Sequence, residues 1–575
     1  MIECMGRRLL LATAVLAALL GPAAAANAAV SASVSGGTLK VTGGGAGERI
    51  ALRAASGGRL AVDVGDNGSA NFTFRRSSFK RIVVNGAGGN DRLRIDDANG
   101  AFTNREKTTL RGGPGSDQLI GGRFAETLDG GDGTDTVDGN AAVDKVILGN
   151  GGDALTWNAG DGRDRVNGGA GADTATVNGT SGADVTTVAT GSVPGHVAVG
   201  NGPDLLGVET LNVSPLGGAD ATTIADLPGT GLATINLGLG VSGAGDAASD
   251  VVDLNGSSSV DVVTVGVAPS GVQVTGLTSL ITILQSEAAN DDVHVNGLGG
   301  NDTLTGVTGL AALIGLTLDG GDGNDTLNGG NGADTLLGGA GNDTVDGNAG
   351  NDTAFLGAGN DLFIWDPGDG SDVVEGQADA DTLRFNGSAG AEIFAASSNG
   401  SRLLFTRNVG NIVMDVDDVE TLDLNALGGI DTVTVNDLGP TDVATVDVDL
   451  GVSGAGDGSV DAVTVNGTAG VDLVNVAGGA GSVTLTTVAL TLLIANAEPA
   501  NDALTANLAG GADLFSASGL AATSVQLTVN GGAGDDVIVG SQGNDTLDGG
   551  TNNDYIDGGA GIDSASNGET VVNVP

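Results

Sequence analysis

The chain has 575 residues, of which 104 are glycine and only 2% are aromatic, so a conventional core rich in aromatic side chains is excluded. Lys and Arg number 22 against 71 Asp and Glu, which gives a formal net charge of −49 at pH 7. Such a charge argues against nucleic acid or an anionic membrane as the main partner and favours cations.

The first 28 residues have the pattern of a cleavable export signal. Arg7 and Arg8 precede a short apolar run over residues 9–20, and a stretch of small residues ends at Ala28. About twelve apolar residues are too few to span a bilayer. We therefore expect cleavage after Ala28, a secreted or cell-surface protein, and no membrane span. The single cysteine, Cys4, lies in this signal, so the mature protein has no disulfide available.

Residues 29–111 form a β-rich half-spacer in which Lys and Arg outnumber Asp and Glu, whereas the rest of the chain is strongly acidic. Two interpretations stay open for this basic segment. It is a solvated face, or it contacts an anionic envelope polysaccharide or the acidic part of another copy of the chain. The basic cluster consists of Arg75, Arg76, Lys80 and Arg81.

Nonapeptides with glycine at positions one, two and four and aspartate at position six recur in three blocks, at residues 112–176, 320–384 and 531–566. The second block opens with GGDGNDTLN at Gly320 and holds five such units before a two-residue insertion. The sixth-position carboxylates are Asp117, Glu126, Asp135, Asp144, Asp153, Asp164 and Asp173 in the first block, Asp325, Asp334, Asp343, Asp352, Asp361, Asp372 and Asp381 in the second, and Asp536, Asp545, Asp554 and Asp563 in the third.

The spacing of these residues predicts a parallel roll with two nonapeptides per coil. Glycines supply turns with positive φ, and positions seven to nine make a three-residue strand with its apolar middle residue pointing inward. Residues 18 apart then stack about 4.8 Å apart, which places Asp325 over Asp343, Asp334 over Asp352 and Asp343 over Asp361. Two carboxylates at that distance repel by roughly 3 kcal/mol. Carboxylates and turn carbonyls without His or Cys form an all-oxygen site suited to Ca²⁺.

These nonapeptides resemble the RTX, or haemolysin-type, calcium-binding repeat family, with GGDGNDTLN and GGAGNDTVD fitting its consensus at every position. The resemblance implies a right-handed parallel β-roll in which the sixth-position aspartates and turn carbonyls bind several Ca²⁺ ions between coils. The first block departs from the consensus, so we expect it to bind weakly or incompletely. The departures are Glu126 for Asp, Asn140 and Ala142 for glycine, and nearby positive charge at Lys145, Arg163 and Arg165.

Two further replacements put Asp379 and Asn552 in the fourth-position glycine's place, where Asn tolerates a left-handed turn better than Asp does. A disordered acidic tract is the alternative for all the repeats. Disorder does not explain apolar residues that recur nine apart in phase with aspartate, so we expect disorder only without calcium. We expect the chain to fold after export, when extracellular calcium binds.

The spacers at residues 177–319 and 385–530 show period-two alternation and, as we interpret them, lack the acidic register. They are wider coils of the same solenoid, which we favour, or separate β-sandwiches. Shifting the chain by 208 residues lays Trp157 over Trp365, so a block and its spacer form a duplicated unit of about 210 residues. Residues 567–575 form a tail. The expected fold is all-β, with parallel β-roll blocks joined by β-rich spacers.

No catalytic motif stands out, because GxSxG and HExxH are both missing from the sequence. His196 and His294 are isolated, and we interpret each as an ordinary strand residue. Trp157 and Trp365 could stack on a sugar, but their matching places favour a packing role. We expect a non-enzymatic, exported calcium-binding protein with a structural or adhesive role. The rivals are a polysaccharide-active solenoid of lyase or epimerase type and self-assembly into a surface layer.

Overall fold

The computed structural model describes residues 29–574, so the predicted export signal lies outside the described residues. Within this range the regular structure consists of β-strands and four short 3-10 turns: η1 (Arg76–Ser78), η2 (Asp97–Asn99), η3 (Leu310–Ala312) and η4 (Val409–Asn411). No helix in the described part is long and apolar enough to cross a membrane. The chain divides into an N-terminal unit (29–141 and 145–150) and a C-terminal unit (142–144 and 151–574), each built from two largely parallel sheets, A and B.

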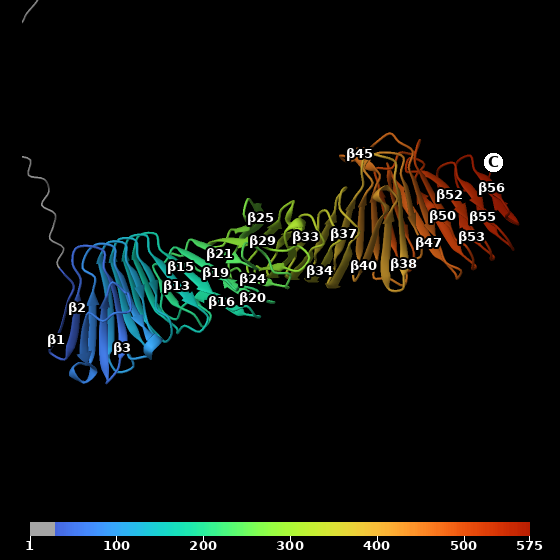
Figure 1. The fold of residues 1–575 in the computed structure, drawn as a ribbon. Coiled ribbons are helices and arrows are strands. Elements are labelled where there is room, and N and C mark those ends of the chain that lie inside the picture. The colour runs from blue at the N-terminus through green and yellow to red at the C-terminus, as the bar shows by residue number, and fades with distance from the viewer. Residues whose placement is uncertain (1–28, 575) are drawn as a thin grey trace, which may run out of the picture. The chain divides into compact units, whose positions relative to one another are not determined.

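The N-terminal unit, blue in Figure 1, stacks its coils so that sheets A and B alternate along the chain. Parallel pairing runs β2–β6–β8–β10–β12 in sheet A and β3–β7–β9–β11 in sheet B. The strands of sheet A are β1 (Ser31–Ser35), β2 (Thr38–Thr42), β6 (Arg81–Asn85), β8 (Lys107–Pro114), β10 (Glu126–Asp132) and β12 (Lys145–Asn150). Those of sheet B are β3 (Arg49–Ala55), β4 (Arg59–Val64), β5 (Phe72–Arg75), β7 (Arg92–Asp96), β9 (Gln118–Ile120) and β11 (Thr136–Asp138).

The C-terminal unit repeats the same alternation over many more coils (Figure 1). Sheet A holds β14 (Arg165–Ala170), β16 (Val185–Thr190), β17 (His196–Val199), β18 (Asp204–Leu206), β20 (Ala221–Ala225), β24 (Val251–Asn255), β28 (Asp292–Asn296), β30 (Gly315–Asp322), β32 (Thr335–Ala340), β34 (Thr353–Ala358), β36 (Val373–Ala378), β38 (Ile393–Asn399), β39 (Arg402–Arg407), β40 (Ile412–Asp417), β42 (Thr432–Val435), β46 (Ala462–Asn466), β50 (Ala503–Asn507), β52 (Gln526–Asn530), β54 (Thr546–Asp548) and β56 (Ser564–Ser566).

Sheet B of the C-terminal unit covers the opposite side of each coil. Its strands are β13 (Ala154–Asn158), β15 (Thr174–Asn178), β19 (Thr210–Ser214), β21 (Thr234–Gly238), β25 (Val262–Ala268), β26 (Gly271–Thr275), β27 (Leu280–Leu284), β29 (Thr303–Gly306), β31 (Thr326–Asn328), β33 (Thr344–Asp346), β35 (Leu362–Trp365), β37 (Thr382–Asn386), β41 (Thr421–Asn425), β43 (Thr445–Asp449), β47 (Leu473–Gly479), β48 (Ser482–Thr486), β49 (Thr491–Ala495), β51 (Leu514–Leu520), β53 (Val537–Val539), β55 (Tyr555–Asp557) and β57 (Thr570–Val572). Two small hairpins, β22 (Gly240–Val241) with β23 (Ala244–Gly245) and β44 (Gly451–Val452) with β45 (Ala455–Gly456), complete the unit.

The nonapeptide blocks confirm the predicted coil of two nonapeptides. Thr326 of β31 pairs with Thr344 of β33, and Thr335 of β32 pairs with Thr353 of β34, each 18 residues along. The predicted three-residue strands hold for β31 and β33 in sheet B. The prediction is wrong for β32 and β34 in sheet A, which have six residues, because the glycines after the strand also pair between coils.

The core of the second block is a column of buried apolar side chains along each sheet, to which every nonapeptide contributes at least one. The inward-pointing residues are fully buried because the strands alternate between interior and solvent. These residues are Leu327, Leu336, Val345, Ala354 and Phe363.

The spacers continue the solenoid, as favoured from their alternation. In the first spacer, β20, β24, β28 and β30 pair in parallel within sheet A and lead directly into the second nonapeptide block. Within the two spacers at residues 177–319 and 385–530, four antiparallel three-stranded insertions interrupt the parallel stack. In sheet A they are β16–β17–β18 and β38–β39–β40, and in sheet B they are β25–β26–β27 and β47–β48–β49. Each spacer has one insertion in sheet A followed by one in sheet B, so the structure repeats in the same way as the duplicated unit of the sequence.

Four residues that replace glycine keep the glycine's backbone conformation. Asn140, Ala142, Asp379 and Asn552 all have positive φ, at 55°, 89°, 79° and 94°. Glycine itself is required where coils approach each other most closely. A Cβ on Gly359, whose φ is 135°, would lie 1.8 Å from the carbonyl oxygen of Gly341 in the preceding coil.

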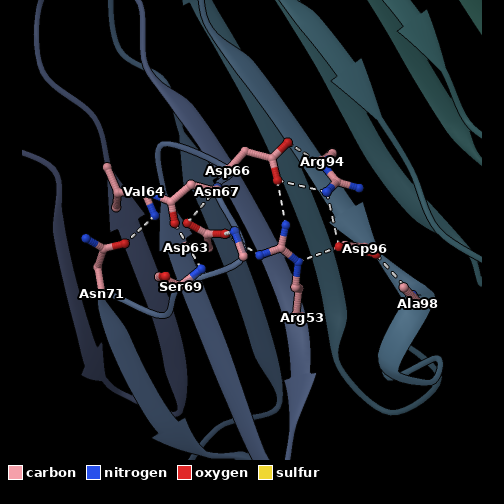
Figure 2. A network of polar contacts seen from close by, with 11 residues as sticks. Arg53, Asp63, Val64, Asp66, Asn67, Ser69, Asn71, Arg94, Asp96 and Ala98 are labelled. Carbon is pink, nitrogen blue, oxygen red and sulfur yellow. Dashed lines mark hydrogen bonds and ion pairs between the residues drawn. The ribbon is translucent and has the colours of Figure 1, made fainter.

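A network of ion pairs on sheet B holds two of the basic residues of the N-terminal unit, Arg53 and Arg94. Figure 2 shows Arg53 between Asp63, Asp66 and Asp96, with Arg94 donating to Asp66 at 2.7 Å. The hydrogen bond from Arg94 holds the pKa of Asp66 below its usual range. Of the predicted basic cluster, Arg76 pairs with Glu106 at 2.7 Å, whereas Arg75, Lys80 and Arg81 are exposed.

Candidate calcium ladder

Each sixth-position aspartate in the second block is joined to its neighbour one coil away. The backbone N–H of Asp325 donates to Oδ1 of Asp343 at 2.7 Å, and that of Asp343 donates to Oδ1 of Asp361 at 2.7 Å. On the other side of the roll, Asp334 donates in the same way to Asp352 at 2.8 Å. The three predicted stacking pairs are therefore confirmed. We call these columns of hydrogen-bonded carboxylates, on both sides of the roll, the acidic ladder.

The acidic ladder runs through all three blocks. The two-residue insertion does not break it, because Asp352 and Asp361 donate to Asp372 and Asp381, now 20 residues along. Every sixth-position carboxylate of the blocks is buried. The further ladder bonds within the blocks join Asp117 to Asp135, Asp144 to Asp164, Asp153 to Asp173, Asp536 to Asp554, and Asp545 to Asp563.

The second carboxylate oxygen of Asp325, Oδ2, lies beside a backbone carbonyl of the next coil. A Cβ on Gly320 would lie 2.5 Å from Oδ2 of Asp325 and 2.6 Å from the carbonyl oxygen of Gly338, the equivalent glycine one coil later. The two oxygens therefore converge on the space that a glycine without a side chain leaves. Buried Oδ2 atoms with no hydrogen-bond partner among the described residues belong to Asp91, Asp117, Asp173, Asp250, Asp302, Asp325, Asp334, Asp343, Asp352, Asp361, Asp381, Asp513, Asp536, Asp554 and Asp563.

Burial raises the pKa of several ladder carboxyls, Asp334, Asp343 and Asp352 among them, because the charged form loses its hydration. The pKa of Asp334 rises to about 7 and that of Asp343 to about 6. For Asp352 burial comes first and the charges of Asp372 and Asp334 add to it, which raises the pKa to about 8. Without a bound cation, the stacked carboxylates are therefore costly to ionise near neutral pH.

The spacers also carry the acidic ladder, so the prediction that they lack the acidic register is wrong. Asp220 donates to Asp250 at 2.8 Å, and Asp302 donates to Asp325 at 2.7 Å, which joins a spacer to a block. Sequence reasoning missed these residues because insertions lengthen the coils and destroy the nine-residue spacing. A glycine five residues before the acid survives at some positions, such as Gly256 before Asp261, but Pro215 stands there before Asp220. The other spacer bonds join Asp184 to Asp220, Asp250 to Asp291, Asp261 to Asp302, Glu392 to Asp431, Asp431 to Asp461, Asp461 to Asp502, Asp472 to Asp513, and Asp513 to Asp536.

Some ladder positions are capped within the chain. At a capped position, Oδ2 (or Oε2) accepts a backbone N–H from four residues earlier, as Asp472 does from Thr468 at 2.9 Å. We call the positions with a partnerless Oδ2 open positions. In the third block Asp545 is capped by Ser541 at 2.6 Å, so the predicted ligands are not equivalent. Further capped positions are Asp184, Asp261, Asp291, Glu392 and Asp502.

The donor set at an open position fits calcium. Two stacked carboxylates and turn carbonyls are hard oxygen ligands, which Ca²⁺ takes in flexible sets of six to eight. Among the described residues, three carboxylates surround one point only at Asp417, Asp418 and Asp442, outside the ladder. Each open position must therefore draw its other ligands from backbone carbonyls or water.

Glu126, which replaces aspartate in the first block, keeps a ladder position at the start of β10. Its Oε2 accepts the N–H of Gly122 at 2.9 Å, and burial raises its pKa to about 7. The longer side chain is thus held by the turn as a capped position.

The histidines considered for other roles pair with aspartates outside the ladder, and Trp365 packs in the core. His196 pairs with Asp204 at 2.9 Å, and His294 pairs with Asp253 at 3.0 Å. Trp365 is fully buried and stacks on Phe385 with the ring centroids 3.9 Å apart, which confirms its packing role.

Parallel coils, stacked acidic turns and glycines without room for a side chain together define a calcium-binding type of β-solenoid. Seven stretches of the chain match the family model of the RTX calcium-binding nonapeptide repeat, namely residues 108–123, 120–155, 158–175, 317–345, 328–363, 368–394 and 530–565. These stretches are therefore RTX calcium-binding nonapeptide repeats, and they coincide largely with the three nonapeptide blocks. No curated protein matches the sequence significantly.

Proposed function

We propose that the chain is an exported solenoid that binds Ca²⁺ at the open positions of its acidic ladder and folds outside the cell as calcium binds. The observation that carries this proposal is that the Oδ2 atom of an open position is buried, accepts no hydrogen bond from the described residues and lies next to a backbone carbonyl of the following coil. Extracellular calcium modules have Kd values of about 10⁻⁴–10⁻³ M. At about 1 mM Ca²⁺ and a Kd near 0.1 mM, each site adds roughly 1.4 kcal/mol of stability.

The role we propose is structural or adhesive and not catalytic. A rigid stack with calcium between its coils presents long, regular outer faces, which suit contact with an envelope polysaccharide or with further copies of the chain. Export is supported by the signal pattern before Ala28. Fractionation of the source cells with N-terminal sequencing tests it, and an exported chain that begins at Ala29 is the expected result.

Equilibrium dialysis against Ca²⁺, with Mg²⁺ as the control ion, tests the calcium sites. Replacing three open positions, Asp325, Asp343 and Asp361, with asparagine should lower the number of bound ions. Replacing the capped Asp261 and Asp472 should leave it unchanged. Equal losses from both variants, or no calcium bound by the original chain, would refute the assignment of open positions as the sites.

A further inference from the structure

The insertions β16–β17–β18 and β38–β39–β40 lie over equivalent tryptophans in the duplicated unit. Trp365 is in register with Phe385, and Trp157 is in register with Val177. The indole Nε1 of Trp365 donates to the carbonyl of Gly370 at 2.8 Å, and that of Trp157 donates to Gly162 at 2.7 Å. The two tryptophans are therefore held in the same way.

In the second copy, aromatic rings and an arginine fill the space around the tryptophan. Phe385 stacks on Trp365, and the rings of Phe394 and Phe405 pack against Phe385 with centroids 6.1 and 4.9 Å away. The guanidinium carbon of Arg407 lies 5.2 Å from the centroid of the Trp365 ring. The same guanidinium forms an ion pair with the buried Glu392.

In the first copy, smaller residues stand in these places and leave a cavity of about 230 Å³. Strand pairing identifies Val199 as the counterpart of Phe405, because Val188 pairs with Val199 as Ala396 pairs with Phe405. Val177, Asp184 and Thr186 follow from the shift of 208 residues, and Asn201 comes two residues after Val199 as Arg407 comes two residues after Phe405. The counterparts of Phe385, Phe394, Phe405, Glu392 and Arg407 are Val177, Thr186, Val199, Asp184 and Asn201, and all five line the cavity together with Trp157.

Asp184, the carboxylate that lines this cavity, lacks the positive partner that its counterpart Glu392 has in Arg407. Oδ2 of Asp184 accepts the N–H of Thr180 at 2.6 Å, as Oε2 of Glu392 accepts that of Ser388 at 2.6 Å. Both are capped ladder positions, so the calcium assignment does not include them. The other oxygen of Glu392 meets Arg407, whereas the other oxygen of Asp184 meets only the hydroxyl of Thr180, at 3.2 Å. No Lys or Arg is among the residues that line the cavity.

We propose that the cavity beside Trp157 binds a small organic cation, a guanidinium or amidinium group carried on a flat apolar body. The cation takes the place of the Arg407 guanidinium, donates to Asp184 and lies against the indole. The flat body takes the space that the phenylalanine rings fill in the second copy. Cations over tryptophan and charge-assisted hydrogen bonds to carboxylate provide the attraction, and the chain shows this arrangement with its own arginine.

Isothermal titration of the full chain in saturating calcium, with benzamidinium as the probe and neutral benzamide as its isostere, tests the proposal. Benzamidinium should bind at one site, and benzamide should not. Because the chain has two tryptophans, a Trp365→Phe variant makes the fluorescence specific to Trp157, and the ligand should quench it. No binding up to about 20 mM, equal binding of benzamide, or displacement of the ligand by further calcium would overturn the proposal.

Variants at the cavity separate this site from general binding. Asp184→Asn should weaken benzamidinium binding by about tenfold or more, because a charge-assisted hydrogen bond is lost. Asn201→Arg should abolish binding by restoring the arginine of the second copy. The control Asp322→Asn removes an exposed charge elsewhere and should change nothing. Unaltered binding in the Asn201→Arg variant would contradict the site.

Discussion

Each open carboxylate of the acidic ladder uses one oxygen to join two coils and leaves the other facing carbonyls. Oδ1 of Asp343 accepts the N–H of Asp325, while Oδ2 has no donor among the described residues. At a capped position such as Asp472, a backbone N–H satisfies the second oxygen. The same residue type therefore has two roles, which the turn before it decides.

Replacing Asp343 with asparagine should have opposite effects with and without calcium. The amide keeps the oxygen that joins the coils, removes a buried charge, and puts a donor beside the carbonyls. Without calcium, the unfolding free energy should rise by about 1–3 kcal/mol at pH 8, and calcium affinity at this position should fall. Urea unfolding in chelator and in calcium measures both. The exposed Asp322→Asn serves as the control, and a loss of stability in chelator would count against the account.

A methyl group on Gly359 should disrupt the stack of coils. The left-handed backbone and the carbonyl 1.8 Å from the added Cβ both oppose it, and the cost should be about 2–4 kcal/mol. Gly390, whose added Cβ would meet nothing closer than 3.7 Å, is the matched control. Thermal unfolding of Gly359→Ala and Gly390→Ala in saturating calcium compares them, and equal melting temperatures would refute the close packing.

At the scale of elements, a three-stranded insertion replaces simple coils where the solenoid widens. Strand β39 carries Arg407 over Trp365 and against Glu392, which is 1% exposed. Arg407 neutralises Glu392 from within the chain, whereas we propose that calcium neutralises the carboxylates at open positions. The insertion is therefore a segment whose charge balance does not depend on metal.

Removing Arg407 should be costly, because Glu392 then remains as a buried carboxylate without a partner. Arg407→Ala should lower stability by about 3–5 kcal/mol in saturating calcium, and Glu392→Gln in the same chain should recover part of the loss. The control is Arg384→Ala, since Arg384 is 41% exposed in its pair with Asp423 and should cost less than about 1 kcal/mol. Denaturant midpoints decide, and similar losses in the two variants would contradict the buried role.

Across the whole molecule, the raised ladder pKa values make the calcium-free chain sensitive to pH. The folded-state pKa of Asp334 is about 7 and that of Asp352 about 8, against an ordinary value of 3.8. The folded state thus binds more protons than the unfolded state, so stability falls as pH rises from about 4 to 8. Far-ultraviolet circular dichroism in calcium-free buffer should show more β-structure at pH 5 than at pH 8, and the reverse order would exclude this effect.

Much of the fold could be predicted because the nonapeptide encodes it locally. The coil length is set by the nonapeptide, which holds turn glycines with no room for a side chain, one inward apolar residue and one aspartate. The stacking of Asp325 over Asp343 therefore follows from spacing alone. The strand lengths in sheet A could not be predicted, because the pairing of Gly339 with Gly357 depends on contact between coils.

The spacer part of the ladder escaped prediction for a different reason. Asp302 lies 41 residues after Asp261, and the segment between them includes an antiparallel insertion, so spacing gives no sign that they stack. The distinction between Asp343 and Asp545 was hidden as well, because Ser541 caps the latter through a backbone N–H. The cavity beside Trp157 depends on strand register within β16–β17, which period-two alternation leaves undetermined.

The central claim is that calcium neutralises the acidic ladder and thereby folds the chain. The most direct test is a calcium titration of the chelator-treated chain at pH 8, following heat and far-ultraviolet circular dichroism in the same sample. The account predicts many sites with Kd values near 10⁻⁴ M and β-structure gained in step with their filling. The same β-structure in chelator and in calcium, or gain of structure without calcium bound, would contradict it.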